Sequence, residues 1–268
     1  MADETIPTEI PTVPIEEIPK SERSWKPKTQ LGQLVQQGVI KDIDEIFARG
    51  MQILEAEITN SLLPNLEEDL LLIGQAKGKF GGGQRRIFRQ TQKKTKEGNK
   101  IQFTTCALIG NKDGYVGIGL GKSKETVPAR DKAKLKARTE IIRIRRGCGS
   151  WQCSCREAHS IPFAVEGRCG SSRIRLMPAP KGKGLCVEKE CAKILAIAGI
   201  KDIWSKTTGQ TKTKLNLIYA LLDALRKLST MKIAAADIPR LGVVEGRWQK
   251  GSAQEHSAPA PGVEVFAK

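Results

Sequence analysis

The stretch 101–141 constrains the fold most, because signals for strand, turn, strand and helix follow one another there without a gap. Its first nine residues are rich in β-branched side chains, and Asn-Lys-Asp-Gly at 111–114 is typical of a hairpin turn. Residues 115–120 predict the returning strand, and residues 123–141 predict a helix with Ser123 as its N-cap. A narrow apolar stripe on this helix suits close packing on a sheet. The stripe consists of Ala129, Ala133, Ala137 and Ile141. We therefore expect an α+β fold with antiparallel strands.

Glycines occupy alternate positions of the returning strand, at Gly117, Gly119 and Gly121. The Gly-Lys-Ser that ends the run suggests a phosphate loop, but a Walker loop needs glycine at position 116, where the chain has valine. A dinucleotide-binding loop is excluded as well, because position 122 is lysine. We expect the glycines to permit close packing of the strand or the approach of an RNA backbone. Lys122 and Lys124 would then meet phosphate at the start of the following helix.

The positive charge of the chain is large and clustered. Lysine and arginine number 45 against 29 acidic residues, which gives a formal net charge of +16. Residues 77–100 carry nine basic side chains and one acidic one, and residues 122–146 carry ten and three. Such clusters favour a polyanionic partner, whereas a basic surface kept for solubility would be spread more evenly. Aromatic residues make up only 4%, so contacts with the backbone and shape of folded RNA are favoured over base stacking.

The rest of the chain predicts a second α+β unit and less regular ends. Prolines and acidic residues predict an extended arm at the N-terminus, and apolar residues follow with helical spacing as far as Leu66, Leu70 and Ile73. The predicted units are an acidic arm (1–24), a mostly helical extension (25–76), a first α+β domain (77–143), a cysteine-rich linker (144–159), a second α+β domain (160–232) and a tail (233–268).

Four candidate metal ligands lie close together in the linker: Cys148, Cys153, Cys155 and His159. The chain has seven cysteines, and this odd number favours a reducing compartment with free thiols or a bound metal over disulfides. Thiolates and imidazole suit tetrahedral zinc, which would be structural because protein closes all four positions. The spacing C-x4-C-x-C-x3-H is not a standard zinc knuckle, so reduced residues in an RNA-facing loop are the alternative. Cys169 is an alternative fourth ligand.

Several motifs strongly resemble one protein family, the universal small-subunit ribosomal protein five family, in its archaeal form. They are GYVGIGLGKSKE (114–125), RRGCGSW (145–151), HSIPF (159–163) and GRCGSSRIRLMPAPKGKG (167–184). The resemblance extends in order from Trp25 to Lys232. Residues 78–89 resemble an insertion, and the tail after Met231 matches nothing in the family.

The resemblance implies a double-stranded-RNA-binding-like domain followed by a second small α+β domain with a βαβ-type crossover. It implies a structural constituent of the small ribosomal subunit, not an enzyme, without an organic cofactor and located in the cytoplasm. Its partners would be small-subunit ribosomal RNA, proteins of families four and eight, and messenger RNA near the entry channel. Its role would be in subunit assembly and translational accuracy. No segment approaches the ~18 apolar residues of a membrane span.

The predicted RNA contacts are basic residues in four places. They are Lys93, Lys94, Lys96 and Lys100 in a loop, Lys122 and Lys124 before the helix, Arg143, Arg145 and Arg146 after it, and Arg168, Arg173, Arg175, Lys181 and Lys183 in the second domain. A free duplex-RNA-binding regulator and a metal-dependent RNA-modifying enzyme are the alternative functions. The enzyme is disfavoured, because the zinc-deaminase pattern is absent and the chain has only two histidines.

Overall fold

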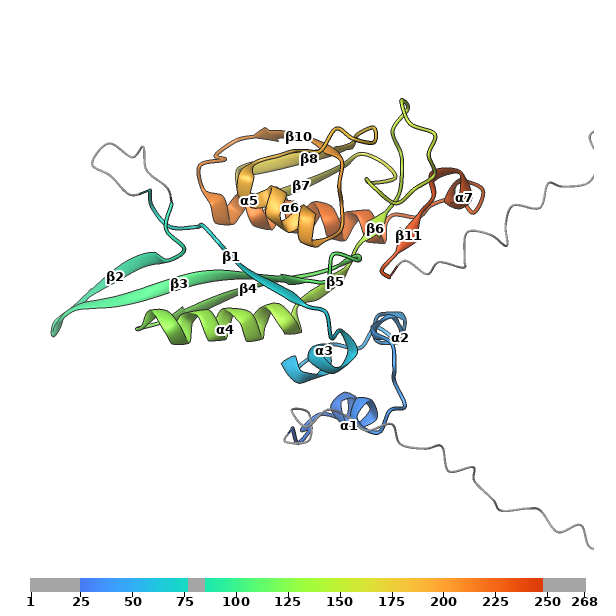
Figure 1. The fold of residues 1–268 in the computed structure, drawn as a ribbon. Helices are drawn as coiled ribbons and strands as arrows, with labels where there is room; N and C mark the ends of the chain where they lie inside the picture. Colours follow the sequence, from blue (N-terminus) through green and yellow to red (C-terminus); the bar gives the residue numbers. More distant parts are fainter. Residues whose placement is uncertain (1–24, 77–84, 248–268) are drawn as a thin grey trace, which may run out of the picture.

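The computed structural model describes residues 25–76 and 85–247 of the chain. Figure 1 shows two sheet-and-helix layers stacked on each other, with three short helices beside the lower layer. The predicted acidic arm, most of the predicted insertion and the end of the predicted tail lie outside the described residues. Within the described ranges, no helix combines the length and apolar character that crossing a membrane requires.

The first sheet is antiparallel and is organised around one long strand, β3. The first half of β3 pairs with β2 and its second half with β1, while β4 pairs along its other edge and β5 follows β4. Helix α4 covers one face of this sheet (Figure 1). The elements are β1 (Glu67–Leu71), β2 (Arg89–Thr95), β3 (Gly98–Gly110), β4 (Tyr115–Ser123), α4 (Thr126–Thr139) and β5 (Ile141–Arg143).

Close packing of α4 on β4 explains the alternating glycines. A Cβ atom at Gly119 would lie 2.3 Å from the carbonyl oxygen of Ala133, and the other two glycines meet the helix backbone just as closely. The predicted alanine stripe forms the matching surface, and its three alanines are completely buried. The glycines therefore serve helix packing, and α4 covers the face on which an RNA backbone would have to approach. The helix begins later than expected, because Ser123 ends β4 and Glu125 is the N-cap.

The second sheet has the strand order β7-β8-β10-β9, with its helices packed on one face. Strands β7, β8 and β10 are antiparallel neighbours, whereas β9 runs parallel to β10 and α5 lies between them in the chain. The elements are β7 (Val165–Cys169), β8 (Ser172–Pro178), β9 (Leu185–Cys186), α5 (Lys189–Ile197), β10 (Ile203–Thr208) and α6 (Lys214–Thr230).

A single hydrophobic core joins the two layers. Leu108 and Ile118 of the first sheet belong to the same buried cluster as Ile194 of α5 and Leu221 of α6. The first sheet is therefore covered on both faces, by α4 on one side and by the second layer on the other (Figure 1). Because both layers share one core, we expect them to hold a fixed mutual orientation.

The N-terminal extension contains three helices and one strand. Helices α1 (Gln30–Gln36), α2 (Ile43–Ala48) and α3 (Ala56–Leu62) surround a small core of their own, which Tyr115 and Ile141 of the first sheet complete. The helical interpretation of the apolar residues around Leu70 is wrong, because this segment is β1 and pairs with β3. An open edge of β3 provides backbone partners there, and local spacing could not reveal them.

Part of the predicted tail is folded. Helix α7 (Asp237–Leu241) and strand β11 (Val244–Glu245) return to the linker, where β11 pairs with β6 (Arg145–Arg146). The prediction of a tail from residue 233 is therefore wrong for these residues. Their content of Ala, Pro and Gly is typical of a linker, but pairing with the distant strand β6 gives them a regular structure.

Candidate nucleic-acid interface and metal centre

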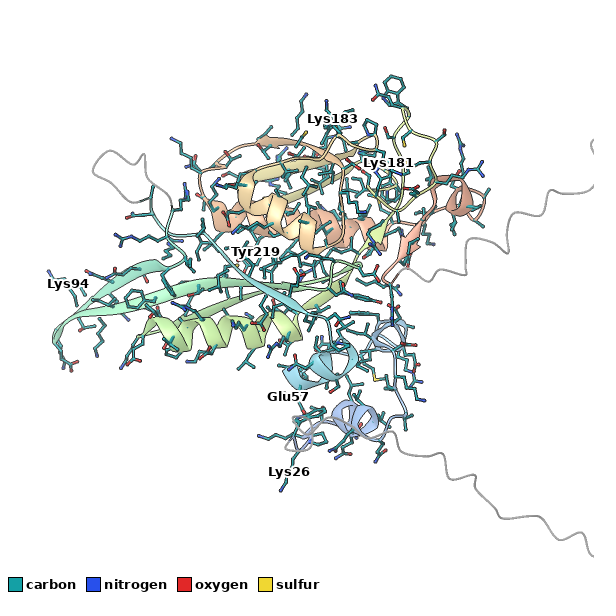
Figure 2. The ribbon with its side chains drawn as sticks, viewed as in Figure 1. Lys26, Glu57, Lys94, Lys181, Lys183 and Tyr219 are labelled. Atoms are coloured by element: carbon teal, nitrogen blue, oxygen red, sulfur yellow. The ribbon has the colours of Figure 1, made fainter. Side chains whose placement is uncertain are left out.

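The first basic surface is the end of the β2–β3 hairpin. The predicted loop at 93–100 is instead two paired strands with a short turn, since Thr95 lies opposite Gly98. Lys93, Lys94 and Lys96 are exposed, and Figure 2 shows Lys94 close to the outer end of the hairpin. Lys93 lies directly opposite Lys100. Like charges in such a pair repel each other, so an anion bound between them would stabilise the hairpin.

The charges in this hairpin are not all equally available. Lys100 forms an exposed ion pair with Glu97 at 3.0 Å. Within residues 25–76 and 85–247, no carboxylate lies within ion-pair distance of Lys93, Lys94 or Lys96. These three lysines are therefore the stronger candidates for contact with phosphate.

The second basic surface is the outer face of the second sheet. Side chains of β8 alternate, so that Ile174 and Leu176 are buried while Arg173 and Arg175 are exposed. Arg173 lies opposite Arg168 on β7, and Arg175 lies opposite both Glu166 on β7 and Lys206 on β10. The sequence analysis missed Lys206, because its basic neighbours lie on β8 and not in its own strand. One acidic and four basic side chains thus share this face, whose net charge suits a polyanion.

Two further pairs of lysines lie in exposed segments. Lys122 is the second-last residue of β4 and Lys124 precedes α4, and both are exposed. Lys181 and Lys183 lie in the loop 179–184 after β8. Both residues are labelled near the top of Figure 2. Lys181 forms an exposed ion pair with Glu157 of the linker at 2.7 Å. Such a pair is weak in water, so this ammonium group can also meet phosphate.

The three arginines after α4 have partners within the protein, so they are weaker candidates for RNA contact than the exposed lysines. Arg146 is only 6% exposed and donates to Asp113 at 2.7 Å and to the Gly246 carbonyl at 3.0 Å. Arg145 bonds to Glu245 and to the carbonyl of Leu228. Arg143 pairs with Glu245 at 3.1 Å and with Asp44 at 3.5 Å. Their guanidinium groups join the linker to other segments. Arg146 is buried in these contacts, whereas the side chain of Arg143 is still 32% exposed.

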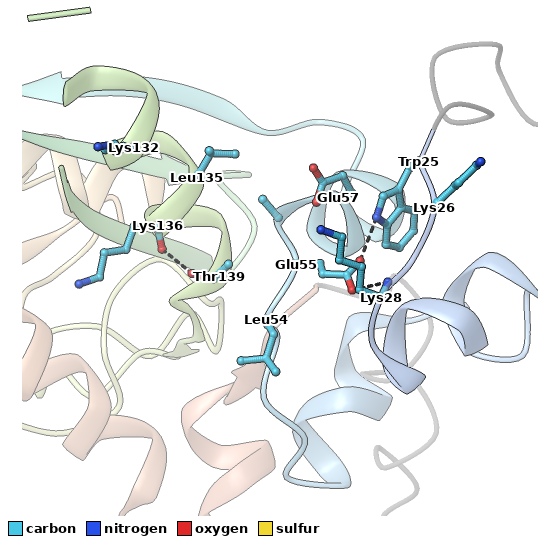
Figure 3. A pocket seen from close by; sticks show the side chains of 11 residues that line it. Trp25, Lys26, Lys28, Leu54, Glu55, Glu57, Lys132, Leu135, Lys136 and Thr139 are labelled. Atoms are coloured by element: carbon cyan, nitrogen blue, oxygen red, sulfur yellow. Dashed lines mark hydrogen bonds between the residues drawn. The ribbon is translucent and has the colours of Figure 1, made fainter. Parts of the chain in front are cut away.

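A cavity of about 540 Å³ lies between the N-terminal extension and α4 (Figure 3). Apolar groups of Trp25, Leu54 and Leu135 line it together with lysines of both elements. Glu55 fixes its wall by accepting hydrogen bonds from the Trp25 indole at 2.9 Å and from the Lys28 amide at 2.8 Å. Neither histidine nor cysteine is among its lining residues, and the carboxylate of Glu55 is occupied by these hydrogen bonds.

The predicted metal ligands meet in space. The sulfur atoms of Cys148, Cys153 and Cys155 and one ring nitrogen of His159 all lie within 4.8 Å of one another. Cys169 is not part of this cluster, and all seven cysteines are free of disulfides. Gly149 permits the close approach of the linker backbone to Pro162, because a Cβ atom there would lie 1.9 Å from the carbonyl oxygen of Pro162.

The cluster fits a tetrahedral zinc ion in both spacing and donor chemistry. Zinc bonds of about 2.3 Å to sulfur and 2.0 Å to nitrogen place the ligand atoms about 3.5 to 3.8 Å apart. Cys153 Sγ and His159 Nε2 are already 3.8 Å apart. The Lys181 amide donates to Cys153 and lowers the pKa of that thiol to about 6, whereas burial raises the pKa of Cys148 to about 12. Three neighbouring thiolates repel one another, so all three thiols can be ionised together only if a cation lies among them.

The sequence analysis did not identify one residue of this centre, Asp202. Asp202 lies at 2.9 Å from His159 Nδ1, and both side chains are almost fully buried. A hydrogen bond from Nδ1–H to this carboxylate leaves Nε2 as the acceptor that faces the sulfur atoms. Since 43 residues separate the pair, no local spacing pointed to it.

An open surface with several basic patches, on a scaffold with a closed ligand cluster, is typical of a structural protein with a polyanionic partner. The family models of Ribosomal protein S5 match the chain, the N-terminal domain over residues 87–145 and the C-terminal domain over residues 167–238. Small ribosomal subunit protein uS5 of Nanoarchaeum equitans is 47% identical over 83% of this chain and 95% of its own length. The corresponding proteins of Methanobrevibacter smithii and Thermofilum pendens are 44% and 45% identical, over 82% and 76% of this chain and 96% and 93% of their own lengths.

The chain therefore belongs to the small ribosomal subunit protein uS5 family. This membership confirms the resemblance derived from the glycine, cysteine and arginine motifs. It also confirms the expected class, which is a structural constituent of the ribosome and not an enzyme.

Proposed function

We propose that this protein binds small-subunit ribosomal RNA through the β2–β3 hairpin, the outer face of the second sheet and the loop 179–184. The observation that carries the proposal is the charge of neighbouring strands, where Lys93 lies opposite Lys100 and Arg168 opposite Arg173. Like charges opposite each other cost stability in the free protein, less at Lys100 because Glu97 pairs with it, and phosphate between them removes the remaining repulsion. The surfaces lie on both layers, and the shared core would hold them in one orientation toward the RNA.

The finer setting follows the family resemblance. The protein would lie in the cytoplasm near the messenger entry channel, beside proteins of families four and eight, and would contribute to assembly and accuracy. The helix-covered β2–β3–β4 sheet supports a double-stranded-RNA-binding-like first domain, and the parallel β9–β10 pair around α5 supports a βαβ-type crossover. Co-sedimentation with small subunits in a salt series separates this role from that of a free duplex-RNA-binding regulator, which would remain at the top of the gradient.

We also propose that the cysteine cluster holds one structural zinc ion. Cys148, Cys153, Cys155 and His159 would be its four ligands, and the ion would neutralise their thiolates. Protein closes every position, so the ion would cross-link the linker and would not activate water. The burial of Cys148 and His159 and their proximity to Cys153 support this assignment.

Replacing Lys93, Lys94 and Lys96 with alanine is expected to weaken binding to small-subunit RNA at every salt concentration. If each lysine contacts one phosphate, the slope of log K against log salt becomes less negative by about 2 to 3. Filter binding of the purified protein to small-subunit ribosomal RNA between 50 and about 300 mM salt measures this slope.

A matched control removes the same number of charges at positions that are neutralised within the protein. Lys112, Lys193 and Lys227 pair with Glu67, Asp69 and Asp223. Their joint replacement with alanine should change the salt slope much less. Equal slopes for both triple variants would show that net charge alone, and not the hairpin, determines binding.

A further inference from the structure

The basic loop 179–184 lies beside the metal cluster and is bonded to it through Asp202 at one end. Near the start of the loop, the backbone amide of Lys181 faces Cys153 and lowers the pKa of its thiol. At its end, the amide of Gly184 donates to Asp202 Oδ1 at 2.7 Å. The other oxygen of Asp202 accepts from His159. His159 of the proposed zinc centre therefore also holds, through Asp202, a loop that carries exposed lysines.

The two ends of the loop have further bonds, because the Ala179 amide donates to Ser160 Oγ at 3.3 Å and the Gly184 carbonyl accepts from the Ile203 amide at 3.2 Å. The residues between these ends have little structure of their own. Gly182 and Gly184 adopt positive φ angles of 86° and 75°, and the Lys183 amide makes a long turn bond of 3.3 Å to Pro180. The Lys181–Glu157 ion pair is exposed on both sides and adds little. Between the two ends of the loop, the bond from the Gly184 amide to Asp202 is the contact that links the position of the loop lysines to His159.

We infer that Asp202 is a positioning residue that couples metal binding to the conformation of the basic loop 179–184, so that a bound metal holds Lys181 and Lys183 in place for phosphate. The inference rests on the proposed zinc site and adds a consequence for the RNA surface. With one carboxylate oxygen on His159 and the other on Gly184, Asp202 bridges the two structures directly. Metal-bound histidines are commonly oriented by such carboxylates.

A simple buried ion pair is the alternative role of Asp202 and His159. The backbone of this region is already joined without their side chains, because the His159 carbonyl accepts from the amides of Lys201 at 2.8 Å and of Asp202 at 3.1 Å. A merely structural pair would therefore affect folding but neither metal affinity nor the response of the loop to metal. These two properties provide the test.

The first measurement is the zinc affinity of the full-length Asp202→Asn variant, by competition with a chromophoric chelator. The asparagine oxygen can still accept from Gly184, but the side chain no longer offers a carboxylate to His159 Nδ1. We expect affinity to fall by about 10- to 100-fold, with a changed visible spectrum of the Co²⁺-loaded protein. Asp223→Asn is the matched control. The Asp223 carboxylate also accepts a hydrogen bond from a backbone amide, that of Arg168 at 3.0 Å, but it is not part of the cluster.

The second measurement is hydrogen exchange of the Lys181 and Gly184 amides in the wild-type protein, with Zn²⁺ or with excess chelator. We expect Zn²⁺ to slow exchange at both amides by about tenfold or more, because it holds both acceptors in place. Wild-type zinc affinity in Asp202→Asn, or loop exchange that is indifferent to Zn²⁺, would overturn the inference while leaving the zinc site intact. Failure of the wild-type protein to bind Zn²⁺ would overturn the zinc site and the inference together.

Discussion

The replacement of Gly119 with valine is expected to lower the free energy of unfolding by about 3 kcal/mol, the upper end of ordinary overpacking costs. The reason is the backbone of α4, which lies 2.3 Å from the position of a Cβ atom at residue 119. A rotamer change cannot relieve this contact, because the obstructing atom is the Ala133 carbonyl oxygen. The helix must move away from β4, which opens the contact that the alanine stripe forms.

Thermal unfolding followed by circular dichroism measures this effect. A loss of this size corresponds to a fall in Tm of about 6 to 12 °C for a chain of this length. Gly50→Ala is the control, since Gly50 has a φ of 66° but nothing within 4 Å of its Cβ position. It should cost only the strain of a left-handed residue, about 1 kcal/mol. Equal shifts for the two variants would contradict the account of helix packing on β4.

The double replacement of Cys153 and Cys155 with serine is expected to reduce bound zinc from one ion per chain to none. Two of four ligands are then lost, and the remaining Cys148 and His159 do not complete a tetrahedral site. The stabilisation by the ion is lost as well, about 4 kcal/mol when free zinc exceeds its Kd a thousandfold. We therefore expect a lower Tm in zinc-containing buffer and an equal Tm for variant and wild type in chelator.

Metal analysis of the dialysed proteins, together with these melting curves, measures the effect. Cys169→Ser is the informative control, because Cys169 was the alternative ligand from the sequence and lies outside the cluster. It should retain one zinc ion per chain. A double variant that keeps its zinc, or a Cys169 variant that loses it, would contradict the assigned ligand set.

The parts of the fold that the sequence predicted correctly are those with strong local signals. The β3–β4 hairpin has a defined turn and β-branched strands, and α4 has its alanine stripe. Strand β1 and the β6–β11 pair were missed, because their order comes from partners far away in the chain. Local propensity carries no information on such partners.

The candidate sites divide in the same way. The metal ligands lie within a short linker, so their spacing was visible, whereas Asp202 joins them only through the fold. Arg145 and Arg146 were predicted to be available for RNA, because their acceptors within the protein are distant in sequence. Asp113 and Glu245 are among these acceptors. Lys206 lacked a basic neighbour in its own strand and became part of a surface only when β10 paired with β8.

Ultraviolet crosslinking of small subunits purified from the source cells, followed by mass spectrometry of the RNA-linked peptides, tests the proposed RNA surface most directly. The account predicts RNA adducts in residues 89–100 of the hairpin and in residues 168–183 of the second sheet and its loop. Adducts confined to α1, α2 and α3, with none in these two segments, would contradict it.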